Sequence, residues 1–177
     1  MSLARRPLEG WIALLALLVL SGALLWHAPH YLSGPEPVGD DSSSHVLASA
    51  RVAEYLRAGS DGWWMSDLNL GFPLAHFYQL LPHVATGVLA LALGGPEHAA
   101  EAYKLLVVLL LLAGPFATWF GLRRLGFGSV AAVCGAVALA TLSAPKAYYG
   151  LTARHYLLSG LYTLLWGSVF VPLALAE

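Results

Sequence analysis

Two polar side chains in the first third of the chain, Asp41 and His45, have the residue types and the spacing of a general-base pair. They are four residues apart at the start of a segment expected to be helical, so one turn brings them together. A carboxylate beside an imidazole can take a proton from a hydroxyl group, or hold a metal ion or a phosphate at a helix start. The plainer interpretation, which spacing alone favours, is that Asp41 caps the helix and His45 begins its apolar face.

The pair belongs to a polar segment, residues 33–73, which holds six of the ten acidic residues of the chain. Within it a helix is predicted over residues 45–58, and Gly59 is expected to end that helix. At 100° per residue one helix face carries His45, Ala48, Ser49, Val52 and Leu56, and the opposite face carries Arg51, Glu54 and Arg57. This pattern predicts an amphipathic helix that lies on a bilayer surface.

The composition places the polar segment beside a membrane. Of the 177 residues, 58% are hydrophobic and only 11% are charged, and the mean hydropathy is +0.68, whereas soluble domains carry roughly 25% charged residues. The single cysteine, Cys134, allows neither a disulfide nor a thiolate metal cage, and we assign no metal ligands. The 9 basic and 10 acidic residues form no basic cluster, which excludes nucleic acid as a partner on electrostatic grounds. The expected partner is the lipid bilayer.

The predicted fold is an all-α, polytopic transmembrane helix bundle, a single membrane domain with four or five membrane segments. Charged residues are absent from five stretches of at least 18 residues, the length that marks a membrane helix. The first helix, within residues 1–32, follows Arg5 and Arg6, which places the N-terminus in the cytoplasm and residues 33–73 outside. Three later helices are expected over residues 101–122, 127–145 and 156–176.

Residues 74–95 differ from the other apolar stretches. Pro82 lies in the first half of this segment, and only its second half is cleanly apolar, which favours a re-entrant segment over a full crossing. Without that crossing, Arg123 and Arg124 fall on the cytoplasmic side, as the positive-inside rule requires. A complete crossing remains the alternative. In the helix that follows these two arginines, small residues recur at every fourth position and permit close helix packing: Gly128, Ala132, Ala136 and Ala140.

The order of these features resembles the first extracytoplasmic loop of C-type integral-membrane glycosyltransferases. The most similar family is the glycosyltransferase-like membrane family that contains the pyruvoyl-tetrahydropterin-synthase-related domain. The resemblance rests on Asp41-x-x-x-His45, the helix that ends at Gly59, Trp64, the sequence GlyPheProLeuAlaHisPheTyr at 71–78 with Pro82, and the ArgArgLeuGly turn at 123–126.

This resemblance implies sugar transfer from a polyprenyl-phosphate donor to an acceptor at the outer face of a bacterial or archaeal cell membrane. Asp41 would be the catalytic base, and Asp40 the second choice. The residues implied in substrate binding are His45, Trp64, His76, Tyr78, Lys146, Arg154 and His155. Two of these assignments have plainer alternatives. Trp64 is also the kind of residue that anchors a chain in the headgroup layer, and the cations at Lys146 and Arg154 also suit helix ends that reach toward headgroups.

The chain departs from this family in two respects. The enzymes have several hundred residues, so we expect this chain to be the N-terminal part of such a protein. After Arg154 the sequence LeuLeuSerGlyLeuTyr offers no second carboxylate, so a bridging divalent metal has little support and no cofactor is identified. Two alternatives to an active glycosyltransferase stay open, namely a non-catalytic membrane scaffold or biogenesis protein, and an inactive fragment.

Overall fold

The computed structural model describes residues 5–26, 28–35, 37, 39–60, 64–66, 71–73, 79–141, 160–175 and 177. Within these residues the chain forms seven α-helices, a 3-10 turn and a two-stranded pairing, so the all-α prediction is confirmed for the part of the chain described. The helices are α1 (Arg5–Leu24), α2 (Ala28–Ser33), α3 (Ser42–Ala58), α5 (Leu80–Leu93), α6 (Ala99–Arg124), α7 (Ser129–Thr141) and α9 (Tyr162–Ala174). The turn η1 (Pro96–His98) precedes α6, and strands β1 (Trp64–Met65) and β2 (Phe72–Pro73) pair antiparallel.

Helix α6 is the longest element and the centre of the molecule. Together with η1 it spans Pro96–Arg124, and it is the one helix in the described residues that is long and apolar enough to cross a membrane. At about 1.5 Å per residue, its 26 residues extend about 39 Å, more than the roughly 30 Å of a hydrocarbon core. Arg123 and Arg124 occupy its last turn, and Glu101 lies in its first turn.

Within the described residues, the other apolar helices are shorter than a membrane span. Helix α9 has 13 residues, against an expected span over 156–176. Helix α7 also has 13 residues, and the last four residues of its expected span, 142–145, lie outside the described residues. The apolar part of α1 is Leu8–Ala23. Gly160 stands just before α9 with a φ of +68°, a left-handed conformation that a helix cannot include. The described helices therefore do not support four or five full-length spans by length and composition.

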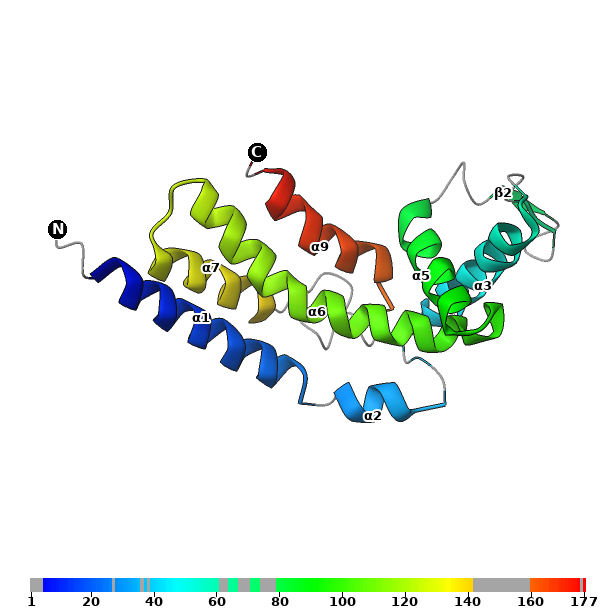
Figure 1. Ribbon diagram of the computed structural model, residues 1–177, viewed down its shortest axis with the longest axis horizontal. Helices are drawn as coiled ribbons and strands as arrows, with labels where there is room; N and C mark the ends of the chain where they lie inside the picture. Colours follow the sequence, from blue (N-terminus) through cyan, green and yellow to red (C-terminus); the bar gives the residue numbers. More distant parts are fainter. Residues whose placement is uncertain are drawn as a thin grey trace.

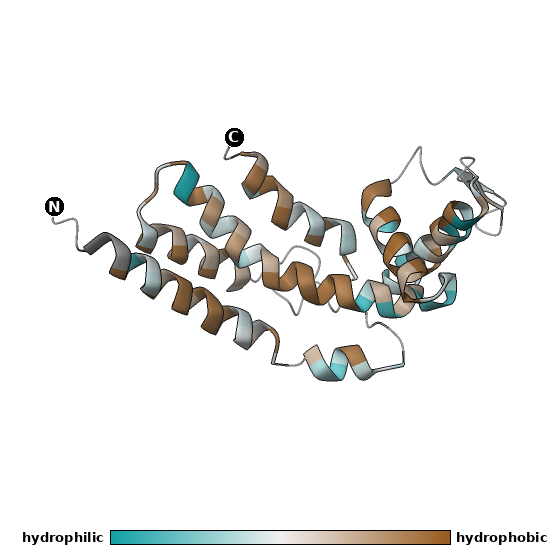
Figure 2. Ribbon diagram, in the orientation of Figure 1, coloured by the Kyte–Doolittle hydropathy of each residue, from teal (hydrophilic) through white to brown (hydrophobic). Residues whose placement is uncertain are grey.

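Four helices run alongside one another in Figure 1: α1, α6, α7 and α9. Helix α6 contacts both α7 and α9, and α1 lies against α6 and α7. The start of α1 and the α6–α7 connection lie at one end of this group, and α3 and α5 lie at the other. Figure 2 shows that α1, α6, α7 and α9 are largely hydrophobic, whereas hydrophilic residues gather on α3 and at the end of α6.

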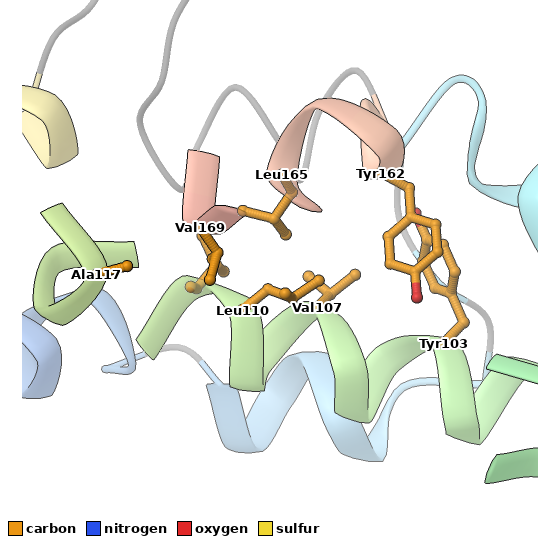
Figure 3. Close-up of a cluster of buried hydrophobic side chains, with 8 residues drawn as sticks. Tyr103, Val107, Leu110, Ala117, Tyr162, Leu165 and Val169 are labelled. Carbon is orange, nitrogen blue, oxygen red and sulfur yellow. The ribbon is translucent and has the colours of Figure 1, made fainter. Parts of the chain in front are cut away.

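The core of this group forms where α9 lies along α6 (Figure 3). Its buried side chains include Tyr103, Val107 and Leu110 from α6, and Tyr162, Leu165 and Val169 from α9. The small-residue stripe of α7 is also used inside the chain, because Ala132 and Ala136 are fully buried where α7 meets α1 and α6. The stripe therefore packs closely, as predicted, and its partners are helices of the same chain.

Helix α5 does not run with α1, α6, α7 and α9. In Figure 1 it stands across the N-terminal end of α6, which we call the outer end of α6, and it packs mainly on α3. The two helices approach closely at Gly87, where an added Cβ would lie 3.1 Å from the backbone nitrogen of Ala53 and 3.2 Å from the carbonyl oxygen of Ser49. The predicted apolar face of α3 is thus buried, but against α5 rather than a bilayer surface. We call α3 and α5 together the outer pair.

Candidate functional site

Asp41 is the N-cap residue of α3, but its side chain does not cap the helix. The carboxylate is exposed, and no hydrogen bond or ion pair of this carboxylate is found in the described residues. Asp40 is also exposed, in the turn before it. The cap interpretation therefore lacks its hydrogen bond, and the Asp41 carboxylate is turned to the surface.

The loop that carries both aspartates is held at its two ends by consecutive residues of α6. At one end the Nζ of Lys104 donates hydrogen bonds to the carbonyl oxygens of Gly34, at 2.7 Å, and Leu32, at 3.0 Å. At the other end the hydroxyl of Tyr103 lies 3.1 Å from Ser42 Oγ. We call Tyr103 and Lys104 the α6 clamp. It fixes the Asp41 loop at the outer end of α6.

Sequence reasoning missed Lys104 as a site residue. Its side chain is only 4% exposed, although lysine is almost never buried without a partner. The position carried one signal, a charge immediately before an uncharged stretch of 18 residues. That signal indicates a helix end, but the partners of Lys104 are backbone carbonyls in a distant segment, which no local pattern identifies.

The start of α9 packs against the start of α3. A Cβ added to Gly160 would lie 2.7 Å from the Ser42 nitrogen and 2.9 Å from the Asp41 nitrogen, so only glycine allows this approach. Residues 142–159 lead directly to this contact. The expected site residues Lys146, Arg154 and His155 belong to that stretch and lie outside the described residues, as do His76 and Tyr78.

The spacing suggested that His45 faces the Asp41 carboxylate, but the structure does not place it there. It is 3% exposed, and its Nδ1 lies 3.1 Å from Nε2 of His83, a fully buried residue of α5. The rings stack at a centroid distance of 5.3 Å. The Nδ1 of His83 lies 3.0 Å from the carbonyl oxygen of Gln79. His45 therefore belongs to a buried imidazole pair that joins α3 to α5.

Burial governs the protonation of this pair. Desolvation lowers the pKa of His45 to about 4, against a smaller opposing effect of a backbone hydrogen bond with Gly160. The pKa of His83 is also lowered to about 4, first by desolvation and then by the charge of His45 when that ring is protonated. Both rings are therefore neutral at pH 7, because a buried imidazolium lacks the solvation it has in water.

Trp64 lies far from Asp41. Its backbone carbonyl accepts a hydrogen bond from the hydroxyl of Tyr55, and Tyr55 lies about 21 Å along the α3 axis from Asp41 at about 1.5 Å per residue. The Trp64 ring is 51% exposed and covers Gly71 of the β1–β2 hairpin. Trp64 and Asp41 are thus placed too far apart to contact one sugar ring.

A groove of about 550 Å³ lies beside the clamped loop. One wall is α3, at Ser43, Val46 and Leu47, and the others come from Pro35 and Pro37 and from the start of α6. Glu97 and Glu101 lie on its border. The volume falls in the range of small-molecule binding sites, and the two carboxylates make it unfavourable for an anion.

Two further observations concern metal ligands and known proteins. In the ranges described, no group of three His, Cys, Asp or Glu side chains is placed to hold a metal ion. Comparison with protein-family models, with curated proteins and with solved structures gave no match. The candidate site is therefore defined by its own geometry, in which an exposed carboxylate lies on a loop fixed to the outer end of α6.

Proposed function

We propose that this chain belongs to a membrane-embedded glycosyltransferase of the C type, in which Asp41 is the base. The observation that carries the proposal is the Asp41 carboxylate, which is exposed and has no partner in the described residues. Its loop is anchored by two residues of a helix that is long and apolar enough to cross a membrane. A base that must approach an external hydroxyl group needs both an accessible carboxylate and a fixed position.

The proposed membrane placement follows from the exposed surface of helices α1, α6, α7 and α9. Large apolar side chains are turned outward on α1 and α7, among them Trp11 at 67%, Val19 at 66% and Val130 at 72% exposure. A contiguous apolar surface of this kind marks contact with lipid or with a partner. In this placement α6 crosses the membrane, α1, α7 and α9 lie beside it within the apolar layer, and α5 stays with α3 at the outer boundary.

The charges at the two ends of α6 orient this arrangement. Arg123 and Arg124 in its last turn take the cytoplasmic side. Glu101 in its first turn, and Glu97 in the preceding η1, take the outer side. From Tyr103 to Arg123 the helix extends about 30 Å, which matches the hydrocarbon core. Tyr103 then marks the outer boundary, and Asp41, one residue before the serine that Tyr103 contacts, lies where the headgroup of a lipid-linked sugar would be.

In the proposed reaction the acceptor oxygen attacks the anomeric carbon of the donor sugar while its proton passes to the Asp41 carboxylate. The bond between that carbon and the polyprenyl-phosphate oxygen breaks, and the phosphate leaves with the bonding electrons. Asp41 then releases the proton to water. The acidic border of the groove suits the acceptor better than the phosphate, because like charges repel. Residues 142–159 contain Lys146 and Arg154, the cations proposed for the phosphate.

The scaffold alternative would need a surface free for a partner helix. The small-residue stripe on α7 has the composition of such a surface, but its residues Ala132 and Ala136 are already buried within the chain. An unpaired surface carboxylate on an anchored loop, in contrast, has no structural role in the described residues. We therefore favour the enzyme.

The test compares Asp41→Asn with Asp40→Asn in membranes that contain the protein. Sugar transfer is followed with labelled polyprenyl-phosphate mannose, glucose and arabinose as donors. We expect Asp41→Asn to abolish transfer and Asp40→Asn to retain most of it, with equal amounts of folded protein, because neither carboxylate has a partner in the described residues. Activity of Asp41→Asn equal to that of the unchanged protein would exclude Asp41 as the base.

Membrane placement is tested separately by thiol labelling in a Cys134→Ala background. A cysteine at Ser43 should react with an impermeant maleimide from outside, and a cysteine at Ser129 should react only after the membrane is opened. Reaction of both from outside would instead place α5 across the membrane.

A further inference from the structure

The buried His45–His83 pair is the strongest polar feature of the protein that the proposed catalytic step does not use. It lies where four helices meet. Beside the two rings are Tyr162 of α9, with its ring centre 5.6 Å from that of His45, and Tyr103 of α6, at 6.4 Å. Both tyrosine hydroxyls are themselves engaged, Tyr162 with Thr86 of α5 at 2.7 Å and Tyr103 with Ser42 at 3.1 Å.

The Gln79 bond and the bond between the rings set the tautomers of the neutral pair, in which His45 has no second N–H to donate to Gly160. The carbonyl oxygen of Gln79 can only accept, so Nδ1 of His83 carries a proton and donates to it. The Nε2 of His83 is then an acceptor, and Nδ1 of His45 must donate to it across 3.1 Å. One proton therefore lies between the rings. In this neutral form the pair connects α3 to the first turn of α5.

Extra protons act on this connection in two steps. The first proton binds Nε2 of His45 and creates a buried cation. Desolvation disfavours the protonated ring, and the backbone hydrogen bond with Gly160 favours it to a smaller extent. The second would bind Nε2 of His83, the atom that accepts the bond between the rings. Two N–H groups and two positive charges would then face each other across 3.1 Å, and the connection would break. The two steps belong to the pair rather than to either ring.

We propose that the His45–His83 pair is a pH-sensitive latch that holds the outer pair, α3 and α5, in place at neutral pH and releases it in acid. In the described residues, the titratable side chains that face the latch are Tyr162 and Tyr103. Asp41 lies one turn earlier on α3, with its side chain exposed. Arg51 and Glu54 pair with each other at 2.6 Å on the opposite, partly exposed side of α3. The latch does not depend on the proposed glycosyltransferase reaction, because its effect is on helix packing.

The direction of the pH effect follows from the two pKa values. Both groups have a folded pKa of about 4, below the unfolded value of about 6.5. The unfolded or opened state therefore binds more protons between these values. The stability that the pair contributes is complete above pH 6.5, and it is lost as the pH falls from 6.5 toward 4.

Hydrogen exchange of the protein in detergent micelles at pH 7 and pH 4 tests the latch, with rates corrected for intrinsic exchange. We expect protection of the α3 and α5 amides to fall about tenfold or more at pH 4, as a pKa shift above one unit implies, while α6 stays protected. The matched control is the double variant His45→Asn and His83→Gln, in which an amide donor and an amide acceptor replace the two facing ring nitrogens. Its α3 and α5 protection should be the same at both pH values.

Three results would overturn the proposal. The first is unchanged protection of α3 and α5 in the original protein at pH 4. The second is an equal loss in the double variant, which would assign the effect to other groups. The third applies if that variant does not fold. The imidazole nitrogen resonances of the unchanged protein are then followed with pH, and ordinary titration of both rings near about pH 6.5 would also overturn the latch.

Discussion

The ammonium group of Lys104 lies 2.7 Å from the carbonyl oxygen of Gly34, a residue 70 positions earlier in the chain. This bond joins the outer end of α6 to the end of α2, and the loop that carries Asp40 and Asp41 begins there. Because the ammonium is buried, the carbonyls of Gly34 and Leu32 take the place of the water that would otherwise solvate it.

Lys104→Met is expected to lower the free energy of unfolding by about 1–3 kcal/mol, because it leaves buried carbonyl groups without a donor. Lys104→Arg keeps donors at that position and should lose less. Arg57→Met is the matched control, since Arg57 is exposed and its replacement should change stability by less than about 0.5 kcal/mol. Denaturant unfolding in detergent micelles measures all three. Equal stability of the two methionine variants would show that the Lys104 bonds contribute nothing.

Local sequence patterns predicted several elements well. The long helix expected over 101–122 is α6, and the helix expected over 45–58 is α3, which begins at Ser42. Gly59 ends α3 in the left-handed conformation, with a φ of +64°. These features depend on neighbours within a few residues, through apolar runs and cap preferences, so a single sequence contains the information they need.

The partners of the site residues could not be predicted in the same way. The spacing of Asp41 and His45 suggested a pair, yet the partner of His45 is His83, 38 residues away. The apolar face of α3 was predicted correctly, but a periodicity shows only that a face is covered. It does not distinguish a lipid surface from a second helix such as α5. Contacts across large separations depend on how the helices pack, which local periodicity does not encode.

Gly160→Ala is expected to displace the start of α3 and with it the Asp41 loop. The new methyl group would lie within 3 Å of the Asp41 and Ser42 nitrogens, at a backbone conformation that already costs a residue with a Cβ about 1 kcal/mol. Gly59→Ala separates the two effects, because Gly59 has a similar φ of +64° and nothing within 4 Å. We expect Gly160→Ala to cost about 1–3 kcal/mol more than Gly59→Ala in thermal unfolding. Equal losses would mean that the α3–α9 contact is looser than described.

Gly87→Ala tests the close approach of α3 and α5. Alanine gains about 1 kcal/mol over glycine in a helix interior, but overpacking typically costs about 1–3 kcal/mol, so a net loss of about 0–2 kcal/mol is expected. Gly167→Ala in α9 meets nothing within 4 Å and should be neutral or slightly stabilising. Unfolding of both variants by denaturant gives the comparison, and a stabilised Gly87→Ala protein would contradict the packing at this position.

Ala132→Leu distinguishes packing within the chain from packing against a partner. Ala132 is fully buried where α7 meets its neighbours, so a leucine there should cost about 1–3 kcal/mol through overpacking even in the isolated protein. Ala131→Leu adds the same volume at an exposed position and should leave stability nearly unchanged. Thermal unfolding of purified protein in micelles checks this without any partner. If Ala132→Leu left the isolated chain as stable as Ala131→Leu but abolished cross-linking to another membrane protein, the α7 stripe would be an interface and the scaffold function would regain its support.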